Sequence, residues 1–586
     1  MRRWLVLAAT FLFLAVSIPA GVLTQKALTE RPPLGLSPYH PVSLYFRLLK
    51  VEVHPFTKLD PQASHTITLW ETRWPLFWST GKYDDFLRHM IRRFQETYPN
   101  VQVEYVFYRI GDVGTALEHA PAGDLPDVYA GPAESIWAVK DYLIPVTSFV
   151  GKSGIPDFEP AALDAVREGR ELWAWPRWIE SVPWVANAEL LKSSGVDPAV
   201  ILQQGWTRRD VIAFVEKFNQ TSKGGPRAWN PASPMVLDAS DTGPLRQLLA
   251  SAGKPSPVTP EGGLAWQGKE LADAVRFLDD LRKAGAFPKN TAPMAQRMLE
   301  LLWEEDAALL VPSHPGLVRH VVERRSRIAL GNLKGAKDID TVFLPPPQAD
   351  TGSSLSPVTN TSVIAVLRKP RPARDDSQGE GAAKPKKTRQ EAREEREYQL
   401  AHERLAVEFA RFMSRGDAAW LPARLKTVPA FVRDRAHWAE WSELPPELST
   451  FLIDAVGSGP VASSGTPPGE APGKPSAISP GKVSRDLTGK RGVPSPGSTA
   501  RGTADGLEAK QEGKEKGKQG IPALSKFERI SLERQVIEEA VAPTWKEFWA
   551  EPLSPEEFEG RLQDRARAVI AAWHHEREKT PAGTPQ

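Results

Sequence analysis

Residues 174–187 read AWPRWIESVPWVAN, and this stretch decides how the rest of the chain is interpreted. It predicts two short extended runs, with three tryptophans and one carboxylate, Glu180, among its residues. Flat indole faces beside a single charged acceptor suit a sugar ring better than they suit a folding core, because a sugar offers both C–H faces and hydroxyls. The stretch therefore predicts a surface for a polar ring rather than an ordinary buried strand.

The residues on the amino-terminal side of this stretch alternate between strand and helix patterns. Apolar residues recur with period two in the predicted strands and on one face of the predicted helices. The order is a strand at 66–70, a helix at 84–98, strands at 101–106 and 125–129, and a helix at 133–142. Alternation of this kind predicts a parallel sheet with helices on both faces, so the fold class is α/β.

Several short motifs accompany these elements. They are Trp70 at the end of the first strand, Phe94 in the first helix, YPNVQV at 98–103, PDV at 126–128, and the Trp175-Pro176 pair followed by Glu180 and Asn187. In this order and spacing they resemble the extracellular solute-binding proteins of family 1, the family of maltose-binding protein. The resemblance covers residues 65–367, 398–455 and 521–575.

The resemblance implies a two-lobe fold of the type II periplasmic-binding-protein class, with a hinge between the lobes. The expected first lobe comprises residues 65–180 and 340–367. The expected second lobe comprises residues 181–339, 398–455 and 521–575. Two segments do not belong to the family pattern. Residues 369–396 are dense in both charges and predict a solvated insert, and residues 457–520 are rich in Gly, Pro, Ser and Lys and predict a disordered insert.

The composition restricts the function classes. A chain of 586 residues with 41% hydrophobic and 25% charged residues predicts more than one folded domain. The net charge of +2 gives no field that would favour nucleic acid. Because the chain has no cysteine, disulfides, Cys-zinc sites and thiol nucleophiles are excluded.

The amino terminus predicts a membrane anchor. Arg2 and Arg3 precede an apolar run from Trp4 to Leu23, which is about long enough to cross a bilayer. We interpret residues 1–23 as an uncleaved signal anchor and residues 24–64, which are rich in proline, as a stalk. The rest of the chain would then be extracytoplasmic and attached to the cell membrane, or secreted if the signal is cleaved.

Six residues are predicted to contact ligand. Three are aromatic and lie at or near predicted strand ends or loops, where open α/β sheets bind ligands: Trp70, Trp178 and Trp229. Three are acidic: by the resemblance Glu180 occupies a position that often contacts ligand, and Glu71 and Glu134 follow strands in comparable positions. The alternative for the tryptophans is ordinary core packing, and for the carboxylates a surface group or a partner of a helix amino terminus.

No catalytic residue, metal site or cofactor is predicted. The Gly-Lys-Ser at 151–153 lacks the preceding glycine of a phosphate-binding loop, and neither a Gly-x-Ser-x-Gly nor a His-Glu-x-x-His motif occurs. We therefore expect a binding protein rather than an enzyme, namely the solute-binding subunit of an ABC importer. The expected ligand is a carbohydrate, in particular an oligosaccharide, and the expected partners are the permease subunits. Two other hypotheses stay open, a membrane-anchored sensor or scaffold with the same clamp and, more weakly, a secreted glycosidase.

Overall fold

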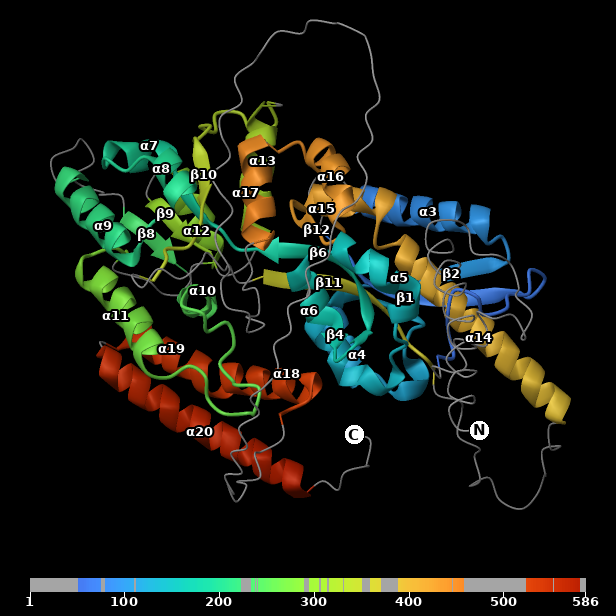
Figure 1. Cartoon of the computed structure of the whole chain (residues 1–586). Coiled ribbons are helices and arrows are strands. Elements are labelled where there is room, and N and C mark those ends of the chain that lie inside the picture. The colour runs from blue at the N-terminus through green and yellow to red at the C-terminus, as the bar shows by residue number, and fades with distance from the viewer. Residues whose placement is uncertain are drawn as a thin grey trace, which may run out of the picture. The chain divides into compact units, whose positions relative to one another are not determined.

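The computed structural model describes residues 51–579 with internal gaps. The gaps are residues 75–79, 110–111, 223–232, 238, 240, 289–294, 305–306, 313–315, 330, 350–358, 370–387, 445, 458–522 and 552. The described elements build two β-sheets with helices packed against them (Figure 1).

The first sheet has six strands in the order β12-β6-β11-β3-β1-β2. Its strands are β1 (His65–Thr72), β2 (Val101–Tyr108), β3 (Val128–Pro132), β6 (Ala174–Ser181), β11 (Thr359–Val366) and β12 (Val428–Pro429). The strands β2, β1 and β3 are parallel, and β11 is antiparallel to both β3 and β6. The predicted strand–helix alternation at 66–142 is confirmed in this sheet.

Alternating side chains explain why β1 forms an inner strand of this sheet, between β3 and β2. Ile67 and Leu69 are fully buried, whereas Thr66 between its buried neighbours is exposed. The helix α3 (Thr80–Thr97) covers the core with Leu87, Met90 and other apolar residues spaced three or four apart, which places them on one helix face.

The second sheet has four strands in the order β10-β7-β9-β8. Its strands are β7 (Trp184–Asn187), β8 (Ser233–Leu237), β9 (Ala307–Val311) and β10 (Thr341–Leu344). The chain passes from the first sheet to the second between β6 and β7 and returns between β10 and β11. The Trp-rich stretch at 174–187 is therefore a crossover between the two sheets, with one of its extended runs in each. The prediction that it forms an exposed surface is wrong, because both runs are strands within sheets and all their residues except Glu180 are buried.

The remaining helices divide between the two sheets. Those that pack with the first sheet or its neighbours are α4 (Asp112–His119), η2 (Ala133–Tyr142), α5 (Thr147–Gly154), α6 (Pro160–Val166), α14 (Arg389–Phe412), η4 (Gly416–Ala419), α15 (Trp420–Leu425), α16 (Arg435–Ser442) and α17 (Pro446–Gly457). Those with the second sheet are α7 (Ala188–Ser193), α8 (Pro198–Gln204), α9 (Arg208–Ser222), α10 (Gly243–Ser251), α11 (Lys269–Lys283), α12 (Ala295–Trp303), α13 (Gly316–Ala329), α18 (Lys526–Gln535), η6 (Val536–Val541), α19 (Ala542–Ala550) and α20 (Pro555–Lys579). Shorter elements are η1 (Ala122–Asp124), η3 (Ile155–Asp157), η5 (Val432–Asp434) and the hairpin of β4 (Arg167–Glu168) and β5 (Glu171–Leu172).

Two of the expected lobe boundaries are corrected by sheet membership. Residues 398–455, expected in the second lobe, belong with the first sheet, because α14 packs into its core and β12 pairs with β6. Within 340–367, expected in the first lobe, β10 pairs with β7 of the second sheet and only β11 joins the first. From the segment 521–575, Leu532, Trp545 and Leu562 pack in the core of the second sheet.

Part of the expected stalk is folded. Val53 and Leu59 are buried in the core of the first sheet, and Phe56 is also buried. The amide of Asn100 donates to the Ala63 carbonyl at 2.6 Å and fixes the chain just before β1. Residues 51–64 therefore belong to the folded unit, because their apolar side chains complete its core.

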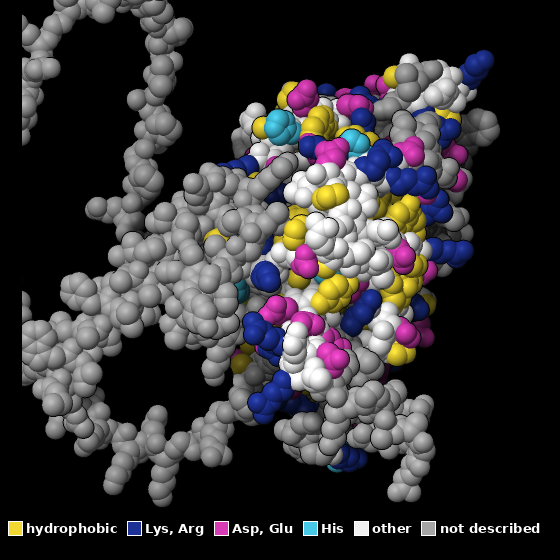
Figure 2. Space-filling model, turned by 90° about the vertical axis from the view of Figure 1, so that its right-hand side faces the viewer, with side chains coloured by type: hydrophobic (Ala, Val, Ile, Leu, Met, Phe, Trp, Pro, Cys, Tyr) yellow, Lys and Arg dark blue, Asp and Glu magenta, His cyan; other side chains and the backbone are white. Residues whose placement is uncertain are grey.

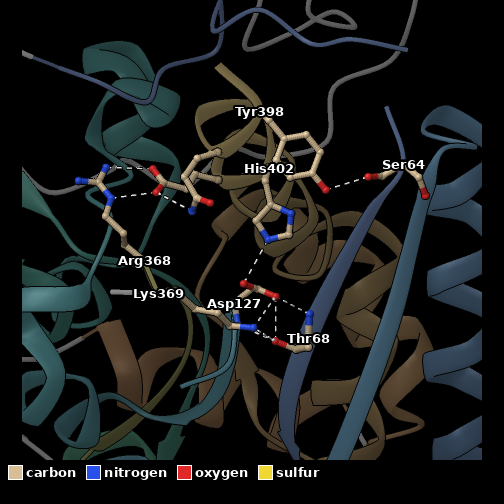
Figure 3. A network of polar contacts seen from close by, with 9 residues as sticks. Ser64, Thr68, Asp127, Arg368, Lys369, Tyr398 and His402 are labelled. Atoms are coloured by element: carbon tan, nitrogen blue, oxygen red, sulfur yellow. Dashed lines mark hydrogen bonds and ion pairs between the residues drawn. The ribbon is translucent and has the colours of Figure 1, made fainter. Parts of the chain in front are cut away.

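Asp127 of the Pro-Asp motif at 126–127 connects several elements at the amino-terminal side of the first sheet (Figure 3). The amide and hydroxyl of Thr68 donate to one oxygen of Asp127 at 2.7 and 2.8 Å, and His402 of α14 lies 3.2 Å from the other oxygen. Burial acts to raise the pKa of Asp127, but the hydrogen bonds from His402 and Thr68 and the charge of Lys369 hold it below its ordinary value. This conspicuous carboxylate therefore joins β1, β3 and α14 inside the protein.

Several expectations lie outside the described residues. They are the anchor at 1–23, the stalk up to residue 50, most of the charged insert and nearly all of the insert at 457–520. Within the part of the chain that the structure describes, no helix is both long and apolar enough to span a membrane.

Candidate functional site

The carboxyl ends of four strands meet at one edge of the first sheet. The parallel strands β1, β2 and β3 all end there. The strand β6 also ends there, because it is separated from β3 by the single antiparallel strand β11. Five of the six predicted site residues lie on or just after these strands: Trp70, Glu71, Glu134, Trp178 and Glu180. An edge of this kind is where open α/β sheets bind their ligands.

Glu71 is fully buried and paired with Arg177 of β6. Both carboxylate oxygens lie 3.0 Å from Nη1 of Arg177, and the two side chains are 0% and 3% exposed. Burial raises the pKa of Glu71, while the charge and hydrogen bonds of Arg177 act to lower it. The same burial, with the negative charge of Glu71, raises the pKa of the neighbouring Tyr83 phenol well above its ordinary value. Glu71 thus ties β1 to β6 beneath the edge.

Trp178 is also buried, and it positions Glu180. Its indole nitrogen donates to Oε1 of Glu180 at 3.2 Å. The guanidinium of Arg177 lies 4.5 Å from the centre of its ring, and Trp74 packs edge-on against it at 5.5 Å. Trp178 is 1% exposed, whereas Glu180 is half-buried. Glu180 is the one residue of β6 that is not buried, so its carboxylate is partly accessible, and the indole of Trp178 holds it in place.

Trp70 forms an aromatic pair that the sequence did not reveal. It is half-buried, and its ring lies 5.1 Å from that of Tyr108, the last residue of β2. The sequence pattern ended this strand at residue 106, so Tyr108 was not among the candidates. Its signal was the continued aromatic run at 105–108, which extends the strand to the same edge.

Glu134 lies at the start of η2, just after β3. Its side chain is exposed to solvent, yet enough protein surrounds the carboxylate for burial to raise its pKa, against the positive charges of Arg534 and Arg246. Arg534 belongs to α18 and forms an ion pair with Glu118 of α4. Arg246 belongs to α10, which packs with the second sheet. Glu134 is therefore a solvent-reachable carboxylate beside cations from elements of the second sheet's core.

The sixth predicted residue, Trp229, lies outside the described residues. The other five share one edge, but in two layers. Glu134, Glu180 and Trp70 are accessible or half-buried, whereas Glu71 and Trp178 lie beneath them with partners inside the protein. The arrangement offers hydrogen-bond acceptors and aromatic rings at one edge, which is chemistry that suits a polyhydroxylated ring.

Solved structures with the same fold include sugar-binding proteins. The sugar-binding protein MalE from Xanthomonas citri is 14% identical, with a TM-score of 0.55 over 88% of this chain and 100% of that chain. The GacH receptor of Streptomyces glaucescens, solved unliganded and with acarbose, is 14% identical, with a TM-score of 0.54 over 87% of this chain and 99% of that chain. The MalE domain from Bdellovibrio bacteriovorus, bound to maltotriose, is 12% identical, with a TM-score of 0.51 over 86% of this chain and 100% of that chain. At these identities the likeness shows the two-lobe fold.

A comparison with curated proteins found no match. The family model of bacterial extracellular solute-binding proteins matches residues 79–415, more than half of the chain. The match includes β2, β3, β6 and β11 and with them most of the edge described above. This chain therefore belongs to the bacterial extracellular solute-binding proteins.

Proposed function

We propose that this chain is the solute-binding subunit of an ABC importer and that its solute is a carbohydrate, held at the carboxyl edge of the first sheet. The observation that carries the proposal is the meeting of Glu134, Glu180 and the Trp70–Tyr108 pair at that edge. Carboxylates accept hydrogen bonds from sugar hydroxyls, and aromatic faces pack against sugar C–H groups. The folds of proteins that bind maltotriose and acarbose support the same solute class.

The six predicted site residues take different parts in this proposal. Glu134, Glu180 and Trp70 would touch the sugar, together with Tyr108. Glu71 and Trp178 would not touch the sugar but would position the residues that do. Glu71 holds β1 to β6 through Arg177, and Trp178 orients the carboxylate of Glu180. Trp229 stays a predicted contact.

Elements of the second lobe would complete the site on closure. Arg246 and Arg534 already bring positive charge to Glu134 from elements that pack with the second sheet. A ligand that contacts both lobes would stabilise a closed form, and that form would dock on the permease. No covalent step is involved. An extracytoplasmic location accords with the family, and anchoring by residues 1–23 stays a prediction.

The test is a thermal-shift screen of the full chain against oligosaccharides, monosaccharides, polyamines and peptides. A ligand that binds only the folded state raises the Tm by mass action. We expect a shift with at least one oligosaccharide and an unchanged sugar after prolonged incubation. A folded protein that responds only to polyamines or peptides would contradict the solute class. A folded protein that responds to nothing would favour the anchored sensor or scaffold, and breakdown of the sugar would favour the glycosidase.

A further inference from the structure

A second hollow lies away from the carboxyl edge, between the ends of α3 and α14. Its volume is about 430 Å³, and both helices and the turn that follows α14 line it. The carbonyl of Tyr98, one of the lining residues, accepts from the amide of Val101 at the start of β2. The hollow therefore lies by the amino-terminal edge of the sheet, opposite the candidate site. Figure 2 shows the side of the protein on which α3, β2 and α14 lie in Figure 1. Apolar side chains occur there in small clusters between basic and acidic side chains.

One wall of the hollow is a buried carboxylate, Glu408, that has a donor on only one of its two oxygens among the described residues. Glu408 is 6% exposed, and its Oε2 accepts from Arg411 at 3.4 Å. Its Oε1 is buried without a hydrogen-bond partner among the described residues. One helical turn away, the fully buried Arg404 has two guanidinium nitrogens without hydrogen-bond partners. Since an unsatisfied buried oxygen is costly, a ligand that donated to this oxygen would gain a favourable hydrogen bond.

The other walls are cationic and aromatic. Arg93, Arg411 and Arg415 line the hollow together with Phe94 and Phe412. Arg93 pairs with Asp417 at the rim, where the two side chains are 45% and 49% exposed. Within the described part of the chain, the buried Nε of Arg415 has no hydrogen-bond partner, although its guanidinium lies over Trp175 at 4.8 Å. The lining thus offers guanidinium groups on one side and, on the other, a buried carboxylate with one oxygen that accepts no hydrogen bond among the described residues.

We propose that this hollow is a second ligand site, for a small carboxylate that also carries a hydrogen-bond donor. The ligand's carboxylate would face Arg411 and Arg415, and its hydroxyl or ammonium group would donate to Oε1 of Glu408. The apolar part of the ligand would pack on Phe94 and Phe412. Sugar acids and α-amino acids share this chemistry, and both fit a volume in the lower range of small-molecule sites.

Calorimetric titration of the full chain tests the proposal with three probes. D-Glucuronate and L-serine represent the two sources of the ligand, and D-glucose is the matched sugar without a carboxylate. We expect one of the two acids to bind and glucose not to compete with it. The variants E408Q and R93A should each weaken that acid by roughly tenfold or more, because each removes a charged group from the site. R93A replaces a rim residue and leaves the core intact.

Two controls separate this site from the carboxyl edge. E397Q replaces an exposed carboxylate of the same helix, which forms an ion pair with Arg393, and should leave binding unchanged. E134Q should also leave it unchanged, so that failure at one site is distinguishable from failure at the other. The proposal is overturned if neither acid binds the folded chain, if binding survives both E408Q and R93A, or if E134Q abolishes it.

Discussion

Both oxygens of the Glu71 carboxylate lie 3.0 Å from Nη1 of Arg177, in a pair from which solvent is almost excluded. The pair joins the strand β1 to β6, the strand that carries Trp178 and Glu180. A buried ion pair contributes little net stability by itself, but the loss of one partner leaves an uncompensated charge in the core. Its main effect is therefore on the relative positions of the two strand ends.

Replacement of Arg177 by methionine should destabilise the protein strongly. The remaining carboxylate of Glu71 is fully buried, so the expected loss is about 3 to 5 kcal/mol in the free energy of unfolding. Urea unfolding followed by circular dichroism measures it. The double variant Glu71→Leu/Arg177→Met should recover much of the loss, because no charge remains buried. Equal stability of the single and double variants would contradict this reading of the pair.

Replacement of Trp70 by alanine should weaken carbohydrate binding. The half-buried indole is proposed to offer its face to the sugar, and its loss should cost about 1.5 kcal/mol, or roughly tenfold in Kd. Calorimetry with the sugar found in the screen measures the change. Trp573→Ala, which removes another half-buried indole from α20, is the matched control and should leave Kd unchanged. A Kd for Trp70→Ala equal to that of the wild type would remove Trp70 from the site.

The affinity for the sugar should depend on pH through Glu134. Burial raises the pKa of this carboxyl, so it becomes protonated at a higher pH than an ordinary glutamate. Protonation removes acceptor strength, and binding should weaken as the pH falls towards that raised pKa. Glu134→Gln should bind more weakly at neutral pH and show a flatter pH profile, whereas Glu556→Gln, at an exposed position of α20, should behave like the wild type. A steep profile retained in Glu134→Gln would assign the titration to another group.

Acid should destabilise the protein through two buried histidines. Burial lowers the pKa of both His54 and His65 to about 4, so the folded state resists protonation that the unfolded chain accepts near pH 6.5. Their contribution is present above pH 6.5 and is lost as the pH falls towards 4, at up to about 1.4 kcal/mol per pH unit for each group. Asp434 acts in the opposite sense, because burial raises its pKa to about 6 and its stabilising effect is lost as the pH rises through that value.

The variant His65→Phe isolates one of these groups. Both ring nitrogens of His65 are buried and make no hydrogen bond with the residues that the structure describes, and the ring stacks on Tyr398 at 4.5 Å, so a phenyl ring can take its place. Urea unfolding at pH 7 and pH 5 should show a smaller loss of stability for His65→Phe than for the wild type. An identical loss in the two proteins would mean that His65 remains uncharged in the unfolded state or is already charged in the folded state.

Much of the first sheet could be predicted from the sequence, because its strands and helices carry their own periodicity. The alternation at His65–Thr72 and the apolar face of α3 are local signals that burial in the fold reinforces. The assignment of residues 398–455 failed because it depended on which sheet an amphipathic helix covers. The apolar face of α14 is visible in the sequence, but its partner is decided by distant contacts such as that of Phe409 with Phe94.

The edge that holds the candidate site could also be predicted, but its layering could not. The ends of the strands determine which residues lie at the same edge of the sheet, and Glu71, Glu134 and Glu180 lie at such ends. Whether a carboxylate there faces solvent or an arginine depends on a side chain about a hundred residues away, as with Glu71 and Arg177. The Pro-Asp motif illustrates the same limit, since only the structure shows that Asp127 is held by Thr68 and His402.

The measurement that tests the central claim most directly is the structure of the full chain with the oligosaccharide found in the screen. We predict a sugar ring against Trp70, with hydroxyls within about 3.2 Å of the carboxylates of Glu134 and Glu180, and with contacts from the second lobe on the opposite side. A sugar bound elsewhere, for example between α3 and α14, with the edge of the first sheet empty, would contradict the account.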